Sequence, residues 1–399
     1  MNRRDFIKKS SVFGLMAAVD FSGVLKNTAR SATASDAKTG KKQYDMEHRN
    51  LGGMGVSAIG LGCLPMVGYY GGKFDKKDMI ALIRRAYEQG VTLFDTAEVY
   101  GPYTSEEWVG EALQPFRDKV KIETKFGFGV EEKQNTALNS QPDHIRRAVE
   151  GSLRRLRTDH IDLYQVHNAP PAQMDIVTGE GGALEALLEA KAAGKIGHIG
   201  VTAHEVATFE MALDMDWVET IMFPYNFVEL QAADLIKKCA EKGKGFICMK
   251  PLAGGAIENA PLAMRFIASN KDITVNIPGM ASEDELKQNV AAACDPTPIS
   301  EEELREVQNI RDTLGNQFCR RCNYCQPCTM GINISFCFTI NGYLTRYGLK
   351  DWAIGRYKGM AVEPNACIEC GMCESRCPYH LPIIEMLKDV YSNFQKEMK

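Results

Sequence analysis

The alternation of short apolar segments with amphipathic ones constrains the fold of this chain more than any other feature. Eight segments have the length and composition of β-strands. They are AIGLG at 58, TLFDT at 92, KIETK at 121, IDLYQVH at 161, IGHIGVT at 196, ETIMFP at 219, GFICMK at 245 and ITVNIP at 273. Amphipathic helices are expected between them, and Asp75 is the candidate N-cap of the first. This pattern predicts the α/β class, specifically a closed parallel (β/α)₈ TIM barrel rather than an open sheet.

Cysteine is concentrated near the end of the chain, where nine of the 13 cysteines lie between Cys319 and Cys377. They form two runs with two-residue spacers. The first run is Cys319, Cys322, Cys325 and Cys328, and the second is Cys367, Cys370, Cys373 and Cys377 followed by Pro378. The second run has the CxxCxxCxxxCP spacing of bacterial ferredoxins, in which the fourth thiolate can ligate the other cluster of a pair.

The first run departs from that spacing because its last spacer is one residue short and Thr329 replaces the proline. One [4Fe–4S] cluster is therefore expected and a second is left open, with Cys337 as an alternative ligand. Structural zinc is the rival, since CxxC pairs also bind zinc. Disulfides are a weaker explanation, because a disulfide requires a particular separation of two Cα atoms and gains nothing from four closely spaced thiols. Residues 316–399 are predicted to form a small, mainly α-helical, ferredoxin-like domain.

The first residues, MNRRDFIKKS, place Arg3 and Arg4 before the apolar stretch SVFGLMAAV, and Ala32-Thr33-Ala34 offers small residues for cleavage. This order predicts a twin-arginine signal with its linker over residues 1–44. A disordered basic tail is the alternative. The protein is expected to be periplasmic or exported, or cytoplasmic if the signal is not used.

The overall composition excludes several classes of protein. With 45% hydrophobic residues and a formal net charge of −4, the chain has neither the composition of a disordered protein nor a basic surface for nucleic acid, and no transmembrane body is expected.

Ionisable residues follow three of the expected strands. FDTAEVYG contains Asp95 and Tyr100, ETKFG contains Lys125, and YQVHN contains His167. In a barrel of parallel strands, chemistry is carried out at the carboxyl ends of the strands. Each residue alone could be a packing residue or part of a structural ion pair, but four at neighbouring strand ends predict a catalytic site.

These motifs, together with MEHRNLGGMGVSAIGLGC, IGVTAH, KPLAGG and IPGMASEDELKQN, resemble the aldo-keto reductases from about residue 45 to 295. A barrel domain is therefore expected over 45–315. The cysteine runs after it resemble the ferredoxin-type tail of a bacterial subgroup. The resemblance implies that Tyr100 is the general acid, that Lys125 lowers its pKa, that Asp95 holds Lys125, and that His167 orients the substrate carbonyl.

The resemblance also implies a nicotinamide cofactor, NAD(H) or NADP(H), contacted by Thr202, Leu252, Ser282, Gln288 and Asn289. The chain departs from the family pattern on this side. Ala203 replaces an asparagine, while Met222 and Met249 replace a glutamine and a stacking tyrosine. Glu283, Asp284 and Glu285 would repel the 2′-phosphate of NADPH. Weak binding, selectivity for NADH and no binding all stay open. Gly60-Leu-Gly62 is expected to serve close strand packing, because no third glycine completes a dinucleotide fingerprint.

Four functions follow from these features. The chain is expected to be a carbonyl/alcohol oxidoreductase using a nicotinamide and carrying a ferredoxin-type tail. The alternatives are a redox enzyme that receives electrons through its clusters from a partner protein, a non-enzymatic electron-transfer protein, and a reductase with a zinc-stabilised tail. The substrate loops show no strong charge trap, so small carbonyls, sugars and steroids are all compatible.

Overall fold

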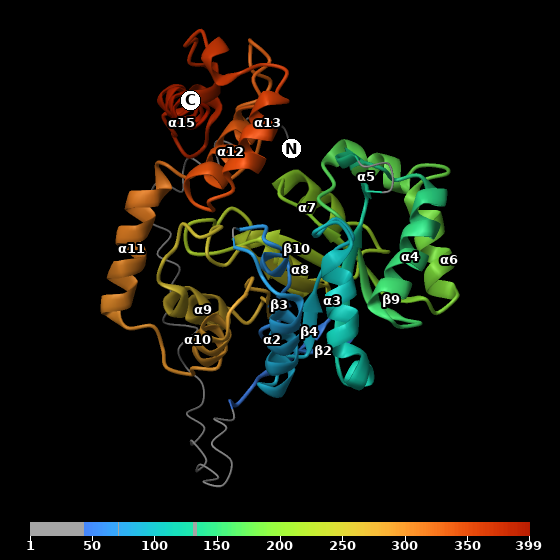
Figure 1. The fold of residues 1–399 in the computed structure, drawn as a ribbon. Helices are drawn as coiled ribbons and strands as arrows, with labels where there is room; N and C mark the ends of the chain where they lie inside the picture. Colours follow the sequence, from blue (N-terminus) through green and yellow to red (C-terminus); the bar gives the residue numbers. More distant parts are fainter. Residues whose placement is uncertain (1–43, 71, 131–133) are drawn as a thin grey trace.

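The computed structural model describes residues 44–70, 72–130 and 134–399 (Figure 1). The predicted export signal lies outside the described residues. Eight parallel strands form one sheet in the order β12-β11-β10-β9-β8-β5-β4-β3. In chain order they are β3 (Leu61–Gly62), β4 (Leu93–Asp95), β5 (Lys121–Phe126), β8 (Ile161–Val166), β9 (Ile196–Thr202), β10 (Thr220–Pro224), β11 (Gly245–Met249) and β12 (Val275–Asn276). Each falls within or at one of the predicted segments, so the predicted fold is confirmed.

The sheet curls so that its two edges meet. Parallel bridges join Ile59 to Asn276 and Gly62 to Gly279. A side chain at Gly62 would crowd the closure, because an added Cβ would lie 3.1 Å from the carbonyl oxygens of Ile277 and Pro278. The Gly60-Leu-Gly62 motif thus serves close strand packing, as predicted.

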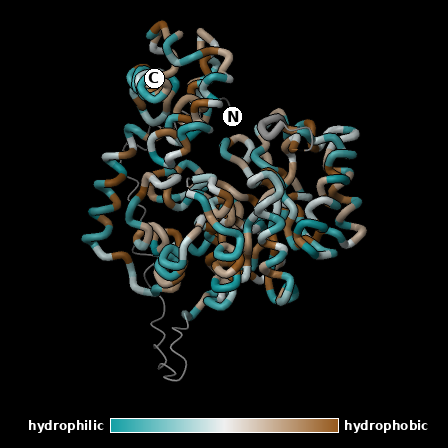
Figure 2. Tube along the Cα trace, viewed as in Figure 1, coloured by the Kyte–Doolittle hydropathy of each residue, from teal (hydrophilic) through white to brown (hydrophobic). Residues whose placement is uncertain are grey.

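Helices surround the sheet and present their hydrophilic faces outward (Figure 2). Asp75 caps α2, since its carboxylate accepts a hydrogen bond from the Lys77 N–H at 2.8 Å, as predicted. The helices of the barrel are α2 (Lys76–Glu88), α3 (Thr104–Leu113), α4 (Pro142–Leu156), α5 (Pro171–Thr178), α6 (Ala183–Ala192), α7 (Val206–Leu213), α8 (Ala233–Glu241), α9 (Ala260–Ser269) and α10 (Glu283–Ala293).

Two antiparallel hairpins were not predicted. β1 (His48–Leu51) pairs with β2 (Met54–Ser57) around a Gly52-Gly53 turn, in which both glycines have positive φ. Leu51, Met54 and Val56 of this hairpin pack against side chains from inside the sheet, such as Leu163. The hairpin therefore closes one end of the barrel. The second hairpin, β6 (Phe128–Gly129) with β7 (Gln134–Leu138), extends from the end of β5.

The last part of the chain is helical and has its own apolar core. After α11 (Glu301–Gly315) come α12 (Ile334–Thr345), α13 (Lys350–Lys358), the short α14 (Met372–Arg376) and α15 (Ile383–Glu397). Ile340, Tyr357 and Phe394 are central to this core. In Figure 1, α12, α13 and α15, in orange-red and red, lie over one end of the barrel, whereas α11 runs along its side near α9. Among the described residues, none of the helices is long and apolar enough to cross a membrane.

Candidate functional site

Asp95 and Lys125 form a buried ion pair at the carboxyl ends of β4 and β5. The Lys125 ammonium donates hydrogen bonds to Asp95 Oδ1 and, at 2.7 Å, to the Thr96 carbonyl. Their exposed fractions are 4% and 1%. A charged amine so deeply buried requires a carboxylate close by. The structure therefore brings this predicted pair together.

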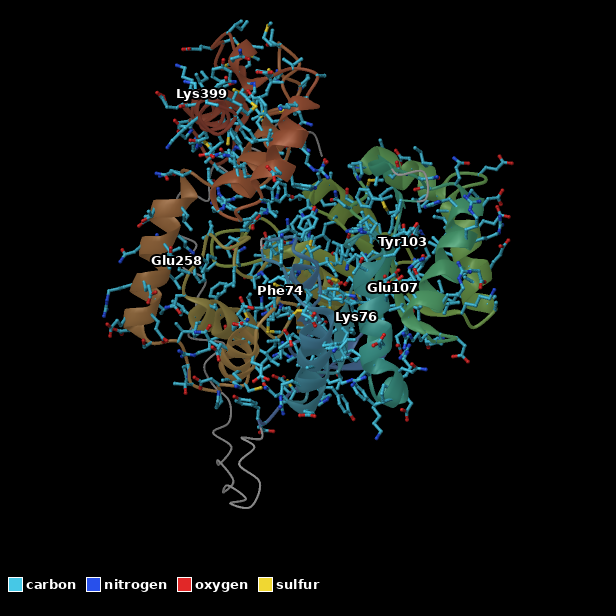
Figure 3. The ribbon with its side chains drawn as sticks, in the orientation of Figure 1. Phe74, Lys76, Tyr103, Glu107, Glu258 and Lys399 are labelled. Atoms are coloured by element: carbon cyan, nitrogen blue, oxygen red, sulfur yellow. The ribbon has the colours of Figure 1, made fainter. Side chains whose placement is uncertain are left out.

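Tyr100 and His167 complete the predicted set of four. Lys125 Nζ lies 5.0 Å from the centre of the Tyr100 ring, and the Tyr100 and His167 ring centres are 5.8 Å apart. The loop that carries Tyr100 ends at Tyr103, labelled in Figure 3, which has a φ of 69° just before α3. The Arg155 guanidinium lies 4.1 Å from the Tyr103 ring centre and fixes this turn.

Burial sets the protonation of both rings. It raises the pKa of Tyr100 well above its usual value, and the negative charge of Asp95 adds to the effect. The net shift is thus opposite to the lowering that we expected from Lys125, so the phenol is held protonated. Burial lowers the pKa of His167 well below its usual value, and the Lys125 charge lowers it further. His167 is therefore a neutral imidazole, and its Nδ1 has no hydrogen-bond partner among the described residues.

Glu123 is a further buried carboxyl group beneath this site that the sequence did not single out. It is fully buried on β5, and Gln165 Nε2 donates to its Oε2 at 3.3 Å. Burial, followed by the charge of Asp95 and a hydrogen bond with it, raises the pKa of Glu123 well above its usual value. The carboxyl group of Glu123 is therefore held protonated next to Asp95, with which it shares a hydrogen bond. Its position two residues before Lys125 was the available sequence signal, because alternate strand residues share a face.

The four residues open into a cavity of about 1460 Å³ between the barrel and the C-terminal helices. Thr202 and Leu252, both predicted cofactor contacts, line this cavity, as do Met222 and Met249. The Thr202 hydroxyl accepts a hydrogen bond from the Asn168 N–H at 2.7 Å. One end of the cavity thus carries the four candidate catalytic residues, and an apolar surface lies beside it.

The other three predicted cofactor residues lie on or next to α10 and do not line the cavity. The Ser282 hydroxyl accepts a hydrogen bond from the Glu285 N–H at 3.2 Å in a capping box, Gln288 is exposed, and Asn289 is buried. Asn289 Oδ1 has no partner in the described part of the chain. Glu285 itself reaches the cavity lining, and the first turn of α10 carries three carboxylates.

Aromatic side chains from the C-terminal part form a roof over the cavity, which could not be predicted from the sequence. The Tyr69 ring meets those of Tyr343 and Trp352 edge to face, with ring centres 6.1 and 5.5 Å apart. The Tyr347 hydroxyl approaches Gly254 so closely that a Cβ there would overlap it. Gly254 belongs to the loop that carries Leu252, so the roof rests on a candidate cofactor loop.

The cysteines of the two runs are interleaved rather than grouped run by run. Cys319, Cys322 and Cys325 lie close enough to Cys377 of the second run for their charges to interact. The backbone N–H of Arg321 donates to Cys319 Sγ at 3.5 Å, an arrangement common around iron–sulfur clusters. This group is one candidate ligand set.

The remaining four cysteines form the second set. A small cavity is lined by Cys328 of the first run and by Cys367, Cys370 and Cys373 of the second. Cys337 is fully buried in the core and does not line it. Two groups of four free thiols match the ligand needs of two [4Fe–4S] clusters, in which every thiolate binds a different iron. The described residues contain no group of three His, Cys, Asp or Glu side chains placed to hold a single metal ion.

The structure thus places a tyrosine, a lysine–aspartate pair and a histidine at one mouth of a parallel barrel. The family model for the aldo/keto reductases matches residues 58–261, and the model for the 4Fe-4S dicluster domain matches residues 318–382. The chain belongs to the aldo/keto reductase family and carries a 4Fe-4S dicluster domain.

Solved structures agree with this assignment. An aldo-keto reductase from Bacillus halodurans in its holo form is 25% identical with a TM-score of 0.58, over 66% of this chain and 96% of its own. A family member from Pseudomonas aeruginosa is 29% identical with a TM-score of 0.56, over 64% of this chain and 97% of its own. An aldo-keto reductase from Klebsiella pneumoniae, solved in complex with NADPH, shares the fold at 24% identity and a TM-score of 0.54, over 67% and 96% of the two chains.

Proposed function

We propose that the barrel interconverts a carbonyl and an alcohol, with hydride from a nicotinamide and with Tyr100 as the general acid. One observation carries this proposal: Asp95, Tyr100, Lys125 and His167 all line a single cavity at the carboxyl ends of the strands. When bound, the reduced nicotinamide supplies a hydride to the carbonyl carbon.

The residues of the chain supply the proton and the orientation. Neutral His167 is positioned to hydrogen-bond the carbonyl oxygen, and Tyr100 gives its phenolic proton to that oxygen as the carbon gains the hydride. The positive charge of Lys125, held by Asp95, stabilises the phenolate that remains. The carbonyl thus gains one hydride and one proton, and the alcohol leaves.

We further propose that the cofactor is NAD(H) rather than NADP(H). The cavity is large enough for a dinucleotide, and Glu285 of α10 belongs to its lining. The Ser282 hydroxyl is already used in the cap of α10, and three carboxylates occupy its first turn. A 2′-phosphate there would meet repulsion from all three.

Substitution of Tyr100 tests the general acid. Tyr100→Phe removes one hydroxyl and keeps the ring, so we expect kcat/KM for carbonyl reduction to fall by roughly a hundredfold or more while the visible cluster absorbance is kept. Tyr87→Phe is the matched control, since Tyr87 stacks on Phe116 at the helix surface, away from the cavity. Equal turnover by both variants would show that Tyr100 is not the acid.

A second function is supported by the position of Cys319. This candidate cluster ligand lines the same cavity as the catalytic residues. A partner protein that donates single electrons could therefore reduce the carbonyl through the clusters in two steps, with two protons taken up, one of them from Tyr100. An anaerobic titration of the cluster-loaded protein with NADH and with NADPH separates the two routes. NADH binding that bleaches the clusters would show electron transfer between the barrel site and the clusters. Binding without bleaching would mean that the clusters are structural or exchange electrons with a partner protein. No binding of either nucleotide would favour this second function.

Export through the twin-arginine pathway is also a proposal, supported by Arg3, Arg4 and the apolar stretch after them. Replacing both arginines with lysine should keep the full-length protein in the cytoplasm of a bacterial host, whereas the native chain should appear in the periplasmic fraction. Equal distribution of the two chains would argue against the signal.

A further inference from the structure

We infer that the cavity contains a binding site for an anionic oxygen group, a carboxylate or a phosphate, formed by Lys250 of the barrel and Arg321 of the cluster-binding part. This inference rests on the proposed function and narrows its substrate to carbonyl compounds that carry such a group, unless the anion belongs to the dinucleotide.

Lys250 is the first element of the site. It follows β11 in the left-handed conformation, with a φ of 55°, and lines the cavity. No carboxylate in the described ranges forms an ion pair with its ammonium. Glu229 is the carboxylate whose charge acts on Lys250, but both of its oxygens accept hydrogen bonds from other side chains. Glu229 Oε1 accepts from Arg321 Nη2 at 2.6 Å, and Oε2 accepts from Asn226 Nδ2 at 3.0 Å.

Arg321 supplies the second element from the loop between Cys319 and Cys322. Its side chain is 20% exposed and lines the same cavity. Nη1 donates to the Cys319 carbonyl at 3.4 Å, Nη2 to Glu229, and Nε is a buried donor with no partner within the described part of the chain. A buried guanidinium N–H without an acceptor is costly, so an added acceptor would stabilise it.

The groups around Lys250 and Arg321 show that the Glu229 carboxylate is the negative charge nearest to both cations. Burial, and then the Arg321 charge, lowers the pKa of Lys250 to about 7, with Glu229 acting in the opposite direction. Burial, and then Lys250 and Arg321, lowers the pKa of His204, whose Nδ1 lies 2.6 Å from Asn168 Oδ1. The nearby Glu205 carboxylate accepts from Asn323 Nδ2 at 3.1 Å.

An anion bound between Lys250 and Arg321 would be stabilised by both cations. It would supply the acceptor that Arg321 Nε lacks and a counter-charge for Lys250. A hydrogen bond between two charged groups is about twice as strong as one between neutral groups, which makes such a site selective.

A matched pair of substrates tests the inference on the cluster-loaded protein. We would measure kcat/KM with NADH for benzaldehyde and 4-carboxybenzaldehyde, which differ in one carboxylate. Calorimetric binding of benzoate and of inorganic pyrophosphate would be measured in parallel. The native protein should prefer the carboxylated aldehyde by roughly tenfold or more.

Three variants decide the origin of that preference. Lys250→Met should reduce the ratio to about one, Arg321→Lys should reduce it partly because the planar fork is lost, and Lys242→Met should leave it intact. Lys242 is the control because it pairs with Asp214 on the exposed surface. The cluster absorbance of each variant shows that it has folded.

The outcomes are distinct. If Lys250→Met weakens the binding of NADH and pyrophosphate about tenfold but leaves the substrate ratio unchanged, the anion is the pyrophosphate of the dinucleotide. If neither aldehyde is turned over, the proposed function fails, and weaker binding of benzoate or pyrophosphate to Lys250→Met still supports the site. Native-like ratio and binding in Lys250→Met would overturn the inference.

Discussion

The guanidinium of Arg321 and the carboxylate of Glu229 join the cluster-binding part to the barrel. Arg321 Nη2 donates to Glu229 Oε1 at 2.6 Å, and the carboxylate is fully buried. Arg321 lies between two candidate cluster ligands, whereas Glu229 follows β10. Neighbouring contacts reinforce the connection, since the Arg320 guanidinium donates to the Val228 carbonyl at 3.2 Å. The loop that holds one ligand set is therefore fixed directly to the mouth of the barrel.

Removing the Glu229 carboxylate should destabilise the contact between the barrel and the cluster-binding part. Glu229→Ala leaves a buried guanidinium without its partner, which costs about 3–5 kcal/mol of stability. We expect a lower Tm and less iron per chain after gel filtration. Glu241→Ala, an exposed change on α8, is the control. A Tm and an iron content equal to those of the control would show that this ion pair does not couple the two parts.

Glu123 should behave as a neutral group. Burial, and then the charge of Asp95, raises its pKa, so Glu123→Gln preserves both charge and shape at pH 7 and should change the free energy of unfolding by less than about 1 kcal/mol. Asp95→Asn, in contrast, leaves the Lys125 ammonium unpaired and should cost about 3 kcal/mol or more. Thermal unfolding followed by circular dichroism compares the two, and equal losses would mean that Glu123 is charged.

The interleaved cysteines predict which variants affect the same cluster. Cys377→Ala should remove the cluster that Cys319→Ala removes, although the two residues lie in different runs, so the double variant should lose about one cluster of iron and no more. Cys377→Ala combined with Cys373→Ala should lose about two. Electron paramagnetic resonance of the reduced proteins with iron analysis distinguishes these patterns, and an excess of zinc over iron in the native protein would instead indicate the zinc-stabilised tail.

Anion binding should weaken as the pH rises. Because the pKa of Lys250 lies at about 7, its amine is charged below that pH and neutral above it. Over this range Arg321 stays charged, and His204, with its lowered pKa, stays neutral. A bound anion raises the pKa of Lys250, so benzoate affinity should fall mainly between pH 7 and about 9. Calorimetry at several pH values should give a flat profile for Lys250→Met, and a native profile just as flat would exclude Lys250 as the titrating group.

Local pattern was sufficient to predict the barrel. The eight strands are apolar runs separated by capped amphipathic helices, so their type and order can be predicted from short stretches of sequence. The candidate site residues Asp95, Tyr100, Lys125 and His167 were identified from their places at the ends of these strands. The β1–β2 hairpin also had a local signal, since Gly52-Gly53 between apolar segments is typical of a tight hairpin turn.

Contacts between distant segments could not be predicted in this way. Arg321 lies 92 residues from Glu229 in the chain, and Tyr347 rests on Gly254 through the docking of one folded part on another. The raised pKa of Tyr100 could not be predicted either, because the neighbouring Lys125 was visible in the sequence whereas the depth of burial was not.

The aromatic roof over the cavity has a consequence for how the protein is made. Tyr343, Tyr347 and Trp352 follow the whole barrel in the chain, so a ribosome completes the candidate catalytic residues well before the segment that encloses them. Until that segment folds, the mouth of the barrel is open to water and incomplete. Enclosure of the cavity thus depends on the folding of the same segment that carries the cysteines.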